Sequence, residues 1–297
     1  MVGSGFTDLL QVTIRHLEQL HANGERFVRA SPSSLAALSA APPAPRPAHP
    51  VPHVSTKPIS QEPPQAPPQE RKVLPPTQPR WESPALDPAA KLLAFQQLHA
   101  KAQECLKCAH LAASRTNVVF GTGSIDSDIL FVGEAPGADE DRIGEPFVGK
   151  AGELLTKIIL AMGLSRQTVY IANVLKCRPD TPGQLTGNRK PSPTEMATCL
   201  PYLEEQIAII RPKVMVALGA TAIEGLLGQS RVQVTRIRGQ WLDFHGIPLM
   251  ATYHPAYLLR NESITEKRKV WEDMLAVMER LNLPISPKQR NYFLKAQ

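Results

Sequence analysis

The 297-residue sequence lacks any apolar run approaching the roughly 20 residues that a membrane-spanning helix needs. Its first residues also lack the basic segment followed by an apolar one that marks a secretory signal. Cysteine is scarce, with four residues, and nothing indicates an oxidising compartment, so structural disulfides are not expected. We therefore expect a cytoplasmic protein that makes no contact with a membrane.

An excess of negative charge is also missing. Lys and Arg number 33 against 27 Asp and Glu, which gives a formal net charge of +6, and the isoelectric point is about 9.2. Residues 1–89 carry 8 basic and 7 acidic side chains, so five of the six excess positive charges lie in the remainder. This mildly basic balance is compatible with a polyanionic partner.

Large apolar residues are sparse across residues 31–86, where more than half of the 29 prolines fall. Such a stretch cannot offset the entropy of ordering, so it predicts a disordered linker. Residues 1–30 before it contain one amphipathic helical pattern that ends near Asn23-Gly24. Because an isolated helix of this length is marginal, it should dock on the main domain, on another copy or on a protein partner, unless it stays solvated.

Strand and helix patterns alternate from residue 87 to about residue 283, and residues 284–297 form a predicted C-terminal tail. Asp87 can cap a first helix, whose buried stripe is predicted to comprise Leu92, Leu93, Phe95, Leu98 and Ala102. Strands are predicted at 128–133, 168–174, 214–218 and 248–253, with a weaker one at 240–244. Further helices are predicted at 150–162, 193–210, 220–227 and 265–281.

Continuous apolar strands that alternate with helices indicate a parallel sheet covered on both faces. We therefore expect an α/β fold, a three-layer α/β/α sandwich around a central, mostly parallel four-stranded sheet. Ligands of such sheets bind at the carboxyl ends of the strands. The loops after Val132, Asn173, Leu218 and Tyr253 should therefore share one crevice.

The first of these loops is acidic. It runs Gly133-Glu134-Ala135-Pro136-Gly137 and continues through Asp139, Glu140 and Asp141. Glycine and proline at the strand exit allow a sharp turn and a close approach to a ligand. Four acidic side chains within eight residues exceed what a phosphate cradle would carry, so the loop favours carboxylate chemistry on a neutral or partly positive substrate atom. A solvated acidic loop is the plainer alternative.

Two further strand exits carry polar side chains. Asn173 can donate and accept together, which suits the Watson–Crick edge of a base, although asparagine is equally common in turns. His254 could donate to a developing anion, or it could be an ordinary loop histidine. Leu258 and Leu259, just before Arg260, could fill a gap in a base stack.

The four cysteines are a close pair, Cys105 and Cys108, and two distant residues, Cys177 and Cys199. This pattern fits a site with four thiolate ligands. Structural zinc more often shows a second close pair, whereas iron–sulfur clusters tolerate scattered ligands. Spacing alone places a cluster ahead of zinc and leaves unliganded buried cysteines as a third reading.

Together these stretches resemble the iron–sulfur, or family 4, uracil-DNA glycosylases. The first motif matches over 133–137, 140–141 and 146–152, and the stretch 173–179, the Asn188-Arg189 pair with Pro191, the His254-Pro255 motif and the four cysteines follow in the same order. The resemblance covers roughly residues 90–281. The N-terminal helix and linker lie outside it.

The resemblance implies an enzyme that extrudes deoxyuridine from DNA, hydrolyses the bond from base to sugar and does not nick the strand. It implies a structural [4Fe–4S] cluster held by all four cysteines. Phe147 would stack on uracil, Asn173 would separate uracil from cytosine, and the main chain around Glu134 and Ala135 would help to hold the base. His254 would stabilise the departing uracil anion. Glu140 would position water, supported by Glu134 and Asn188.

Other features are departures from the family or lie outside its motifs. The 21 residues between Cys177 and Cys199 are more than usual, and Ala135 stands where many relatives have glycine. The loop 186–190 has no histidine, which disfavours the covalent chemistry of a related branch. Phosphate contacts are expected from Arg178, Arg189, Arg260 and the basic run 267–269, and for this run a solvated helix face is the alternative. The competing function is a non-enzymatic iron–sulfur or zinc accessory protein that binds DNA.

Overall fold

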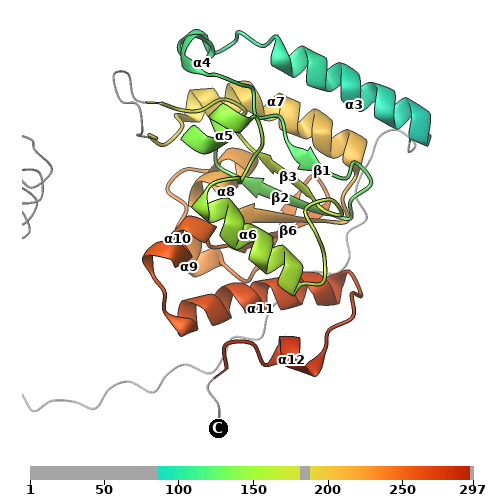
Figure 1. Cartoon of the computed structure of the whole chain (residues 1–297), viewed down its shortest axis with the longest axis vertical. Coiled ribbons are helices and arrows are strands. Elements are labelled where there is room, and N and C mark those ends of the chain that lie inside the picture. Colours follow the sequence, from blue (N-terminus) through green and yellow to red (C-terminus); the bar gives the residue numbers. More distant parts are fainter. Residues whose placement is uncertain (1–85, 181–187, 295–297) are drawn as a thin grey trace, which may run out of the picture. The chain divides into compact units, whose positions relative to one another are not determined.

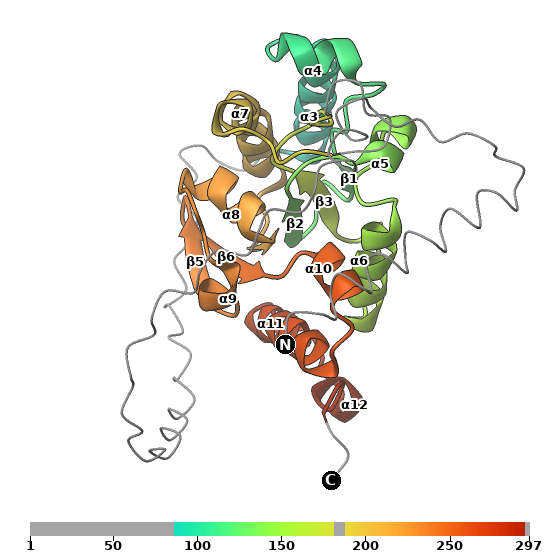
Figure 2. The same cartoon turned by 90° about the vertical axis from the view of Figure 1, so that its left-hand side faces the viewer.

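The computed structural model describes residues 86–180 and 188–294 (Figure 1). The predicted N-terminal helix at 1–30 and nearly all of the predicted linker lie outside the described residues, as does most of the extra sequence before Asn188. A central sheet lies between two helical layers, with α7 on one side and α6 and α11 on the other (Figures 1 and 2). The three-layer prediction is therefore confirmed.

The sheet contains six strands in the order β1-β3-β2-β4-β6-β5. They are β1 (Thr122–Gly123), β2 (Ile129–Gly133), β3 (Tyr170–Asn173), β4 (Val214–Leu218), β5 (Trp241–Phe244) and β6 (Ile247–Thr252). The four inner strands are mutually parallel, and both edge strands are antiparallel to their neighbours. The prediction of four parallel strands thus holds for the inner sheet. The weaker strand predicted at 240–244 is confirmed as β5, but the count of four was wrong, and β1 was missed because two residues carry too little apolar pattern.

The strand register brings the loop-bearing ends together. Gly133 at the end of β2 pairs with Asn173 at the end of β3, and Leu218 at the end of β4 pairs with Thr252 at the end of β6. His254 follows two residues after β6. Four loops that are distant in sequence therefore start from one edge of the sheet.

The helices are α3 (Pro88–Gln103), α4 (Ala109–Ser114), α5 (Ala138–Ile143), α6 (Lys150–Ala161), α7 (Pro193–Ile210), α8 (Ala220–Leu227), α9 (Val234–Ile237), α10 (Pro255–Arg260), α11 (Ile264–Arg280) and α12 (Pro287–Arg290). All four predicted later helices are confirmed to within one residue. The Asp87 carboxylate caps α3 by accepting from the N–H groups of Ala89 and Ala90, both at 3.0 Å. The predicted stripe of α3 is partly wrong, since Leu92 and Leu93 are about half-exposed while Leu98 and Ala102 are buried.

Each face of the sheet has its own apolar core. Phe131 and Val216 point into the core beneath α6 and α11, which includes Leu155 and Trp271. The opposite core lies under α7 and α8. After α11 the chain packs against the layer formed by α6 and α11. There the Trp271 indole donates to the Gln289 carbonyl oxygen. Across 86–180 and 188–294, no helix is both long and apolar enough to cross a membrane.

Candidate active site

Gly133 places the first two functional side chains side by side. A Cβ atom at this position would lie 2.3 Å from Asn173 Oδ1 and 2.5 Å from Phe147 Cζ. Only glycine therefore leaves room for both groups at the end of β2. The amide and the aromatic ring, predicted from separate motifs, share one site.

Asn173 has an unsatisfied hydrogen-bond acceptor in this site. Its side chain is 2% exposed, and Oδ1 is the one buried side-chain polar atom in the described residues that has no hydrogen-bond partner. Leaving such a group unpaired typically costs about 1–3 kcal/mol. An unpaired buried carbonyl oxygen is therefore suited to a ligand that brings an N–H donor.

Phe147 forms an aromatic wall with an unusual backbone. Its φ is 56°, a left-handed conformation that is uncommon for a bulky residue, and its side chain is buried. The ring centroid lies 5.6 Å from that of His254, with an angle of 30° between the planes. A flat group could stack in this site with an imidazole nearby.

The hydrogen bonding and burial of His254 make it a neutral hydrogen-bond donor. It caps α10, and its Nδ1 accepts from the Ala256 N–H at 3.1 Å, so the ring proton lies on Nε2. Burial, assisted by the positive charge of Arg260, lowers the pKa of His254 to about 4. The imidazole therefore stays neutral at physiological pH and keeps an N–H available.

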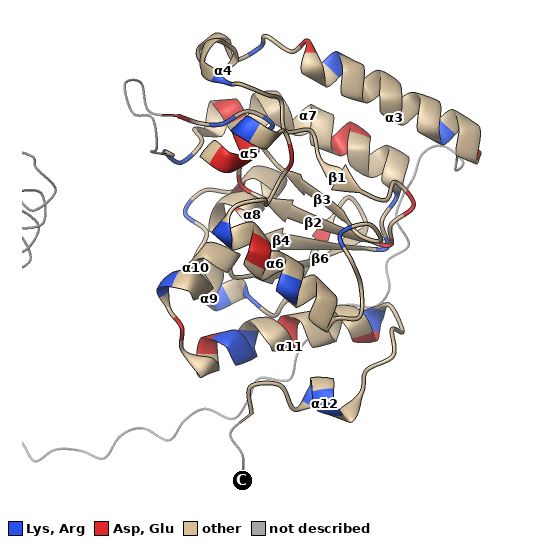
Figure 3. Ribbon diagram, in the orientation of Figure 1, with Lys and Arg blue, Asp and Glu red and all other residues tan. Residues whose placement is uncertain are grey.

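Glu140 is engaged by the main chain of its own loop. Oε2 accepts from the Gly137 N–H at 3.0 Å, and Oε1 accepts from the N–H groups of Val148 and Gly149 at 3.0 and 3.1 Å. The carboxylate therefore joins the start of α5 to the segment that carries Phe147. Asp139, Glu140 and Asp141 occupy the first turn of α5, whose ribbon is coloured red at acidic residues in Figure 3.

Glu134 and Ala135 follow β2 directly, at the same edge. The Glu134 carbonyl oxygen accepts from the Leu175 N–H at 3.1 Å, which links the loops after β2 and β3. Burial raises the pKa of the Glu134 carboxyl, and a hydrogen bond with Thr221 partly offsets this effect. Ala135 is partly buried and packs against the cluster of apolar residues near the cysteines.

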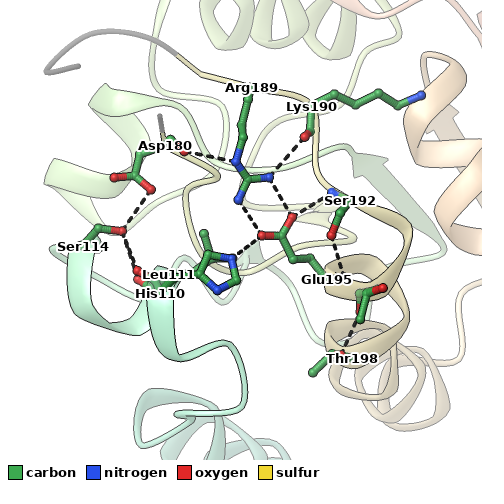
Figure 4. A network of polar contacts seen from close by, with 10 residues as sticks. His110, Leu111, Ser114, Asp180, Arg189, Lys190, Ser192, Glu195 and Thr198 are labelled. Atoms are coloured by element: carbon green, nitrogen blue, oxygen red, sulfur yellow. Dashed lines mark hydrogen bonds and ion pairs between the residues drawn. The ribbon is translucent and has the colours of Figure 1, made fainter. Parts of the chain in front are cut away.

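Asn188 and Arg189 come from the next loop. A Cβ atom at Gly137 would lie 3.2 Å from Asn188 Nδ2, so this amide is close to the glycine loop, and its Oδ1 accepts from Arg178 Nε at 2.9 Å. The Arg189 guanidinium binds both carboxylate oxygens of buried Glu195 (Figure 4). Arg189 therefore stabilises the loop to which it belongs. Its contact with DNA stays a prediction.

The Leu258-Leu259-Arg260 segment forms the end of α10. Leu258 is buried with Tyr253 and Val270, whereas the Leu259 side chain is 43% exposed. Arg260 is also exposed. Of the two leucines predicted to enter a base stack, Leu259 is the one that is available.

The four cysteines line one cavity. Cys105 follows α3, Cys108 caps α4, Cys177 lies beyond β3 and Cys199 lies within α7. Cys177 Sγ accepts from Arg115 Nη1 at 3.3 Å, and Cys199 Sγ accepts from the Lys176 main-chain N–H at 3.2 Å.

The surroundings of these thiols disfavour free thiolates. Burial raises the pKa of the Cys199 thiol to about 11 and also raises those of Cys108 and Cys177. Within the described ranges, no three His, Cys, Asp or Glu side chains converge so that they could hold a single metal ion. Four sulfurs around one cavity match in number the ligands of a four-thiolate zinc site or iron–sulfur cluster.

Sequence reasoning missed the residues that hold this site together. Arg166 donates to the carbonyl groups of Pro146 and Phe147, and Glu195 joins Arg189 to His110. Arg166 and Phe147 are 19 residues apart in the sequence, and His110 and Glu195 are 85 residues apart. No local motif marks such partners.

Comparison with known proteins gives consistent matches. The model of the uracil DNA glycosylase superfamily matches residues 120–275. The type-4 uracil-DNA glycosylase of Thermotoga maritima is 46% identical over 175 residues, which is 59% of this chain and 88% of that protein. That of Archaeoglobus fulgidus is 42% identical over 55% of this chain and 82% of its own, and that of Sulfurisphaera tokodaii is 41% identical over 64% and 86%.

Proposed function

The chain belongs to the uracil DNA glycosylase superfamily and to its type-4 branch, and we propose that it removes uracil from DNA by hydrolysing the bond between base and deoxyribose. The observation that carries the proposal is the unpaired, buried Oδ1 of Asn173 between Gly133 and the ring of Phe147. The product would be an abasic site in an unbroken strand. An acceptor beside a stacking wall is what recognition of a flat base with an N–H edge requires.

Base selection follows from the polarity of the Asn173 amide. Uracil carries a hydrogen on N3, whereas N3 of cytosine is an acceptor. Asn173 Oδ1 can therefore bond uracil, while cytosine would leave that buried oxygen unpaired. Phe147 would stack on the extruded ring.

Departure of the base follows from the state of His254. As the bond from C1′ to N1 breaks, its electron pair moves onto the uracil ring and creates an anion. The Nε2–H of neutral His254 would donate to this anion. Preorganised donors of this kind typically contribute ~2.7–4 kcal/mol to the transition state.

Water would then add to C1′, where positive charge has developed. Glu140, which the three N–H groups fix in place, would supply the negative charge that faces this carbon and orients the water. Glu134 and Asn188 would support it from the flanking loops, and the proton released by the water would pass to this carboxylate set. No lysine enters the scheme, so strand cleavage is not expected.

We further propose that Cys105, Cys108, Cys177 and Cys199 hold a [4Fe–4S] cluster. The shared cavity and the two donors to sulfur support it. When bound, the cluster would crosslink the cysteine-bearing elements and take no part in the hydrolysis.

The partner in this scheme is uracil-containing DNA, single- or double-stranded. Leu259 would enter the gap left by the extruded base, and exposed Arg260 would contact phosphate. Leu258 anchors α10 by packing with Tyr253 and Val270. We propose a cytoplasmic location, and residues 1–30 as a segment that binds a protein partner.

The proposal is tested by chromatographic detection of free uracil released from an oligonucleotide with one deoxyuridine. Wild-type protein should release uracil from this oligonucleotide and should release no base from the matched deoxycytidine oligonucleotide. Asn173→Ala should lower uracil release by about 100-fold or more, since the site depends on this one buried acceptor. Asn291→Ala, which alters an exposed residue at the end of α12, should behave as wild type. Equal activity of Asn173→Ala and wild type would refute the assignment.

A further inference from the structure

Arg166 contacts the main chain on which the aromatic wall is built. It lies between α6 and β3, outside the motifs at the strand ends. Its Nη1 donates to the Phe147 carbonyl oxygen at 3.0 Å, and its Nη2 donates to the Pro146 carbonyl oxygen at 2.8 Å. A planar guanidinium can hold two neighbouring carbonyl groups at once, which a lysine ammonium cannot match in geometry.

The peptide groups that follow Phe147 are bound by a negatively charged side chain, Glu140. Glu140 Oε1 accepts from the N–H groups of Val148 and Gly149, which come directly after Phe147. The peptide groups on both sides of Phe147 are therefore fixed, with carbonyl groups bound to a cation and N–H groups bound to an anion. Both charged groups bind the main chain of the segment.

The backbone of α6 supports the same carbonyl group. A Cβ atom at Gly152 would lie 1.8 Å from the Phe147 oxygen, so the helix approaches as closely as glycine permits. These contacts surround a residue whose φ of 56° is unfavourable for a bulky side chain. Such a conformation persists only where neighbouring groups over-determine it.

We propose that Arg166 is a positioning residue for base recognition, which holds Phe147 in its left-handed conformation so that the ring is in place before the extruded base arrives. This inference rests on the proposed function, because it takes the ring of Phe147 as the stacking surface. Preorganisation lowers the cost of binding and leaves the chemical step to other groups. Arg166 should therefore affect capture of the base far more than its release by His254.

The first test compares Arg166→Met and Arg166→Lys with wild type in steady-state excision of uracil. Arg166→Met should raise KM, and the inhibition constant of free uracil, by about tenfold, while kcat stays within about threefold. Arg166→Lys should show most of this loss, because it keeps the charge but not the fork. Arg290→Met, which removes an arginine of α12 that pairs with exposed Glu279 of α11, should leave both constants unchanged.

The second test asks whether Arg166 acts through the ring. In a Phe147→Ala background, Arg166→Met should have little further effect on KM, whereas unrelated structural damage would add to the loss. Guanidinium ion at low millimolar concentration should restore uracil binding by Arg166→Ala, and an equal concentration of sodium chloride should not. A variant that had merely lost its fold would not be rescued.

The outcomes separate this inference from the proposed function. Active wild type with unchanged KM in Arg166→Met, additive losses with Phe147→Ala, or no rescue by guanidinium would each overturn the role of Arg166 alone. Wild-type protein that releases no uracil would overturn the proposed function and this inference with it.

Discussion

At the scale of single residues, His254 carries the sharpest prediction. His254→Ala removes the Nε2–H donor, so we expect kcat to fall by about 10²–10³-fold. The fold and the cysteine site should persist, because the hydrogen bond that the imidazole accepts comes from the nearby main-chain N–H of Ala256. His99→Ala, at an exposed position of α3, is the matched control and should retain full activity. Full activity of His254→Ala would show that another group stabilises the anion.

The pH dependence provides an independent check on this residue. The pKa of His254 is lowered by burial to about 4 in the folded protein, below its ordinary value near 6.5. Excision by wild type should therefore show no inflection near pH 6.5, and the limb due to His254 should lie near pH 4. The unfolded chain binds the extra proton between these values, so this contribution to stability is complete above pH 6.5 and is lost as pH falls towards 4.

Single-turnover rates between pH 4 and 8, together with urea unfolding over the same range, measure both effects. A rate that falls with an apparent pKa near 6.5 in wild type, but not in a variant at His254, would contradict the neutral, buried imidazole. It would indicate an exposed ring that titrates freely.

The residues of the site were predictable where they follow strands. Asn173 and His254 end two apolar runs, and parallel strands bring such ends together. The three N–H groups on Glu140 and the fork of Arg166 were not predictable, because their partners are set by how loops pack in three dimensions. Sequence reasoning therefore identified the groups that would face a ligand and missed those that hold them.

At the scale of elements, α10 predicts different effects of one substitution on excision from duplex and from single-stranded DNA. Leu259 is exposed on this short helix, while Leu258 is buried beneath it. Leu259→Ala should reduce excision from duplex DNA by about tenfold, since a wedge offsets part of the cost of unstacking, and should change excision from single strands little. Rates on matched duplex and single-stranded oligonucleotides measure this. Equal losses on both substrates would exclude a wedge.

The cysteine site predicts an effect on other elements. Cys105 and Cys108 flank the link between α3 and α4, Cys177 follows β3, and Cys199 belongs to α7. Cys108→Ala should abolish the visible absorption of an anaerobically purified cluster and accelerate amide exchange in α3 and α4. The central strands should stay protected because their apolar cores do not contain the cysteines. Retained absorption, or zinc in place of iron, would contradict the cluster.

Errors at this scale have a common physical cause. Leu92 and Leu93 follow the helical apolar period, yet they are about half-exposed in α3. Periodicity identifies a face that could be buried, but the neighbouring helix decides how much of it is covered. The short α4, α5, α9, α10 and α12 were missed because four to six residues carry too little pattern.

At the scale of the whole described part of the molecule, the inner sheet and its flanking helices were predictable from alternating apolar runs. The strand order β1-β3-β2-β4-β6-β5 was not, because it depends on crossovers that no single run encodes. The order matters for function, since it places Gly133 beside Asn173 and brings Thr252, two residues before His254, to the same edge. The fold thereby brings together the residues to which we assign recognition of the base and stabilisation of the anion.

The most direct measurement is cleavage of an end-labelled oligonucleotide with one uracil, resolved before and after alkali, with anaerobically purified protein. The account predicts an intact strand before alkali and cleavage at the uracil after it, as expected of a glycosylase that leaves an abasic site. Cleavage without alkali would contradict the hydrolytic scheme. No cleavage under either condition, from protein that binds the oligonucleotide and retains its cluster, would contradict the enzymatic function and favour a DNA-binding accessory protein.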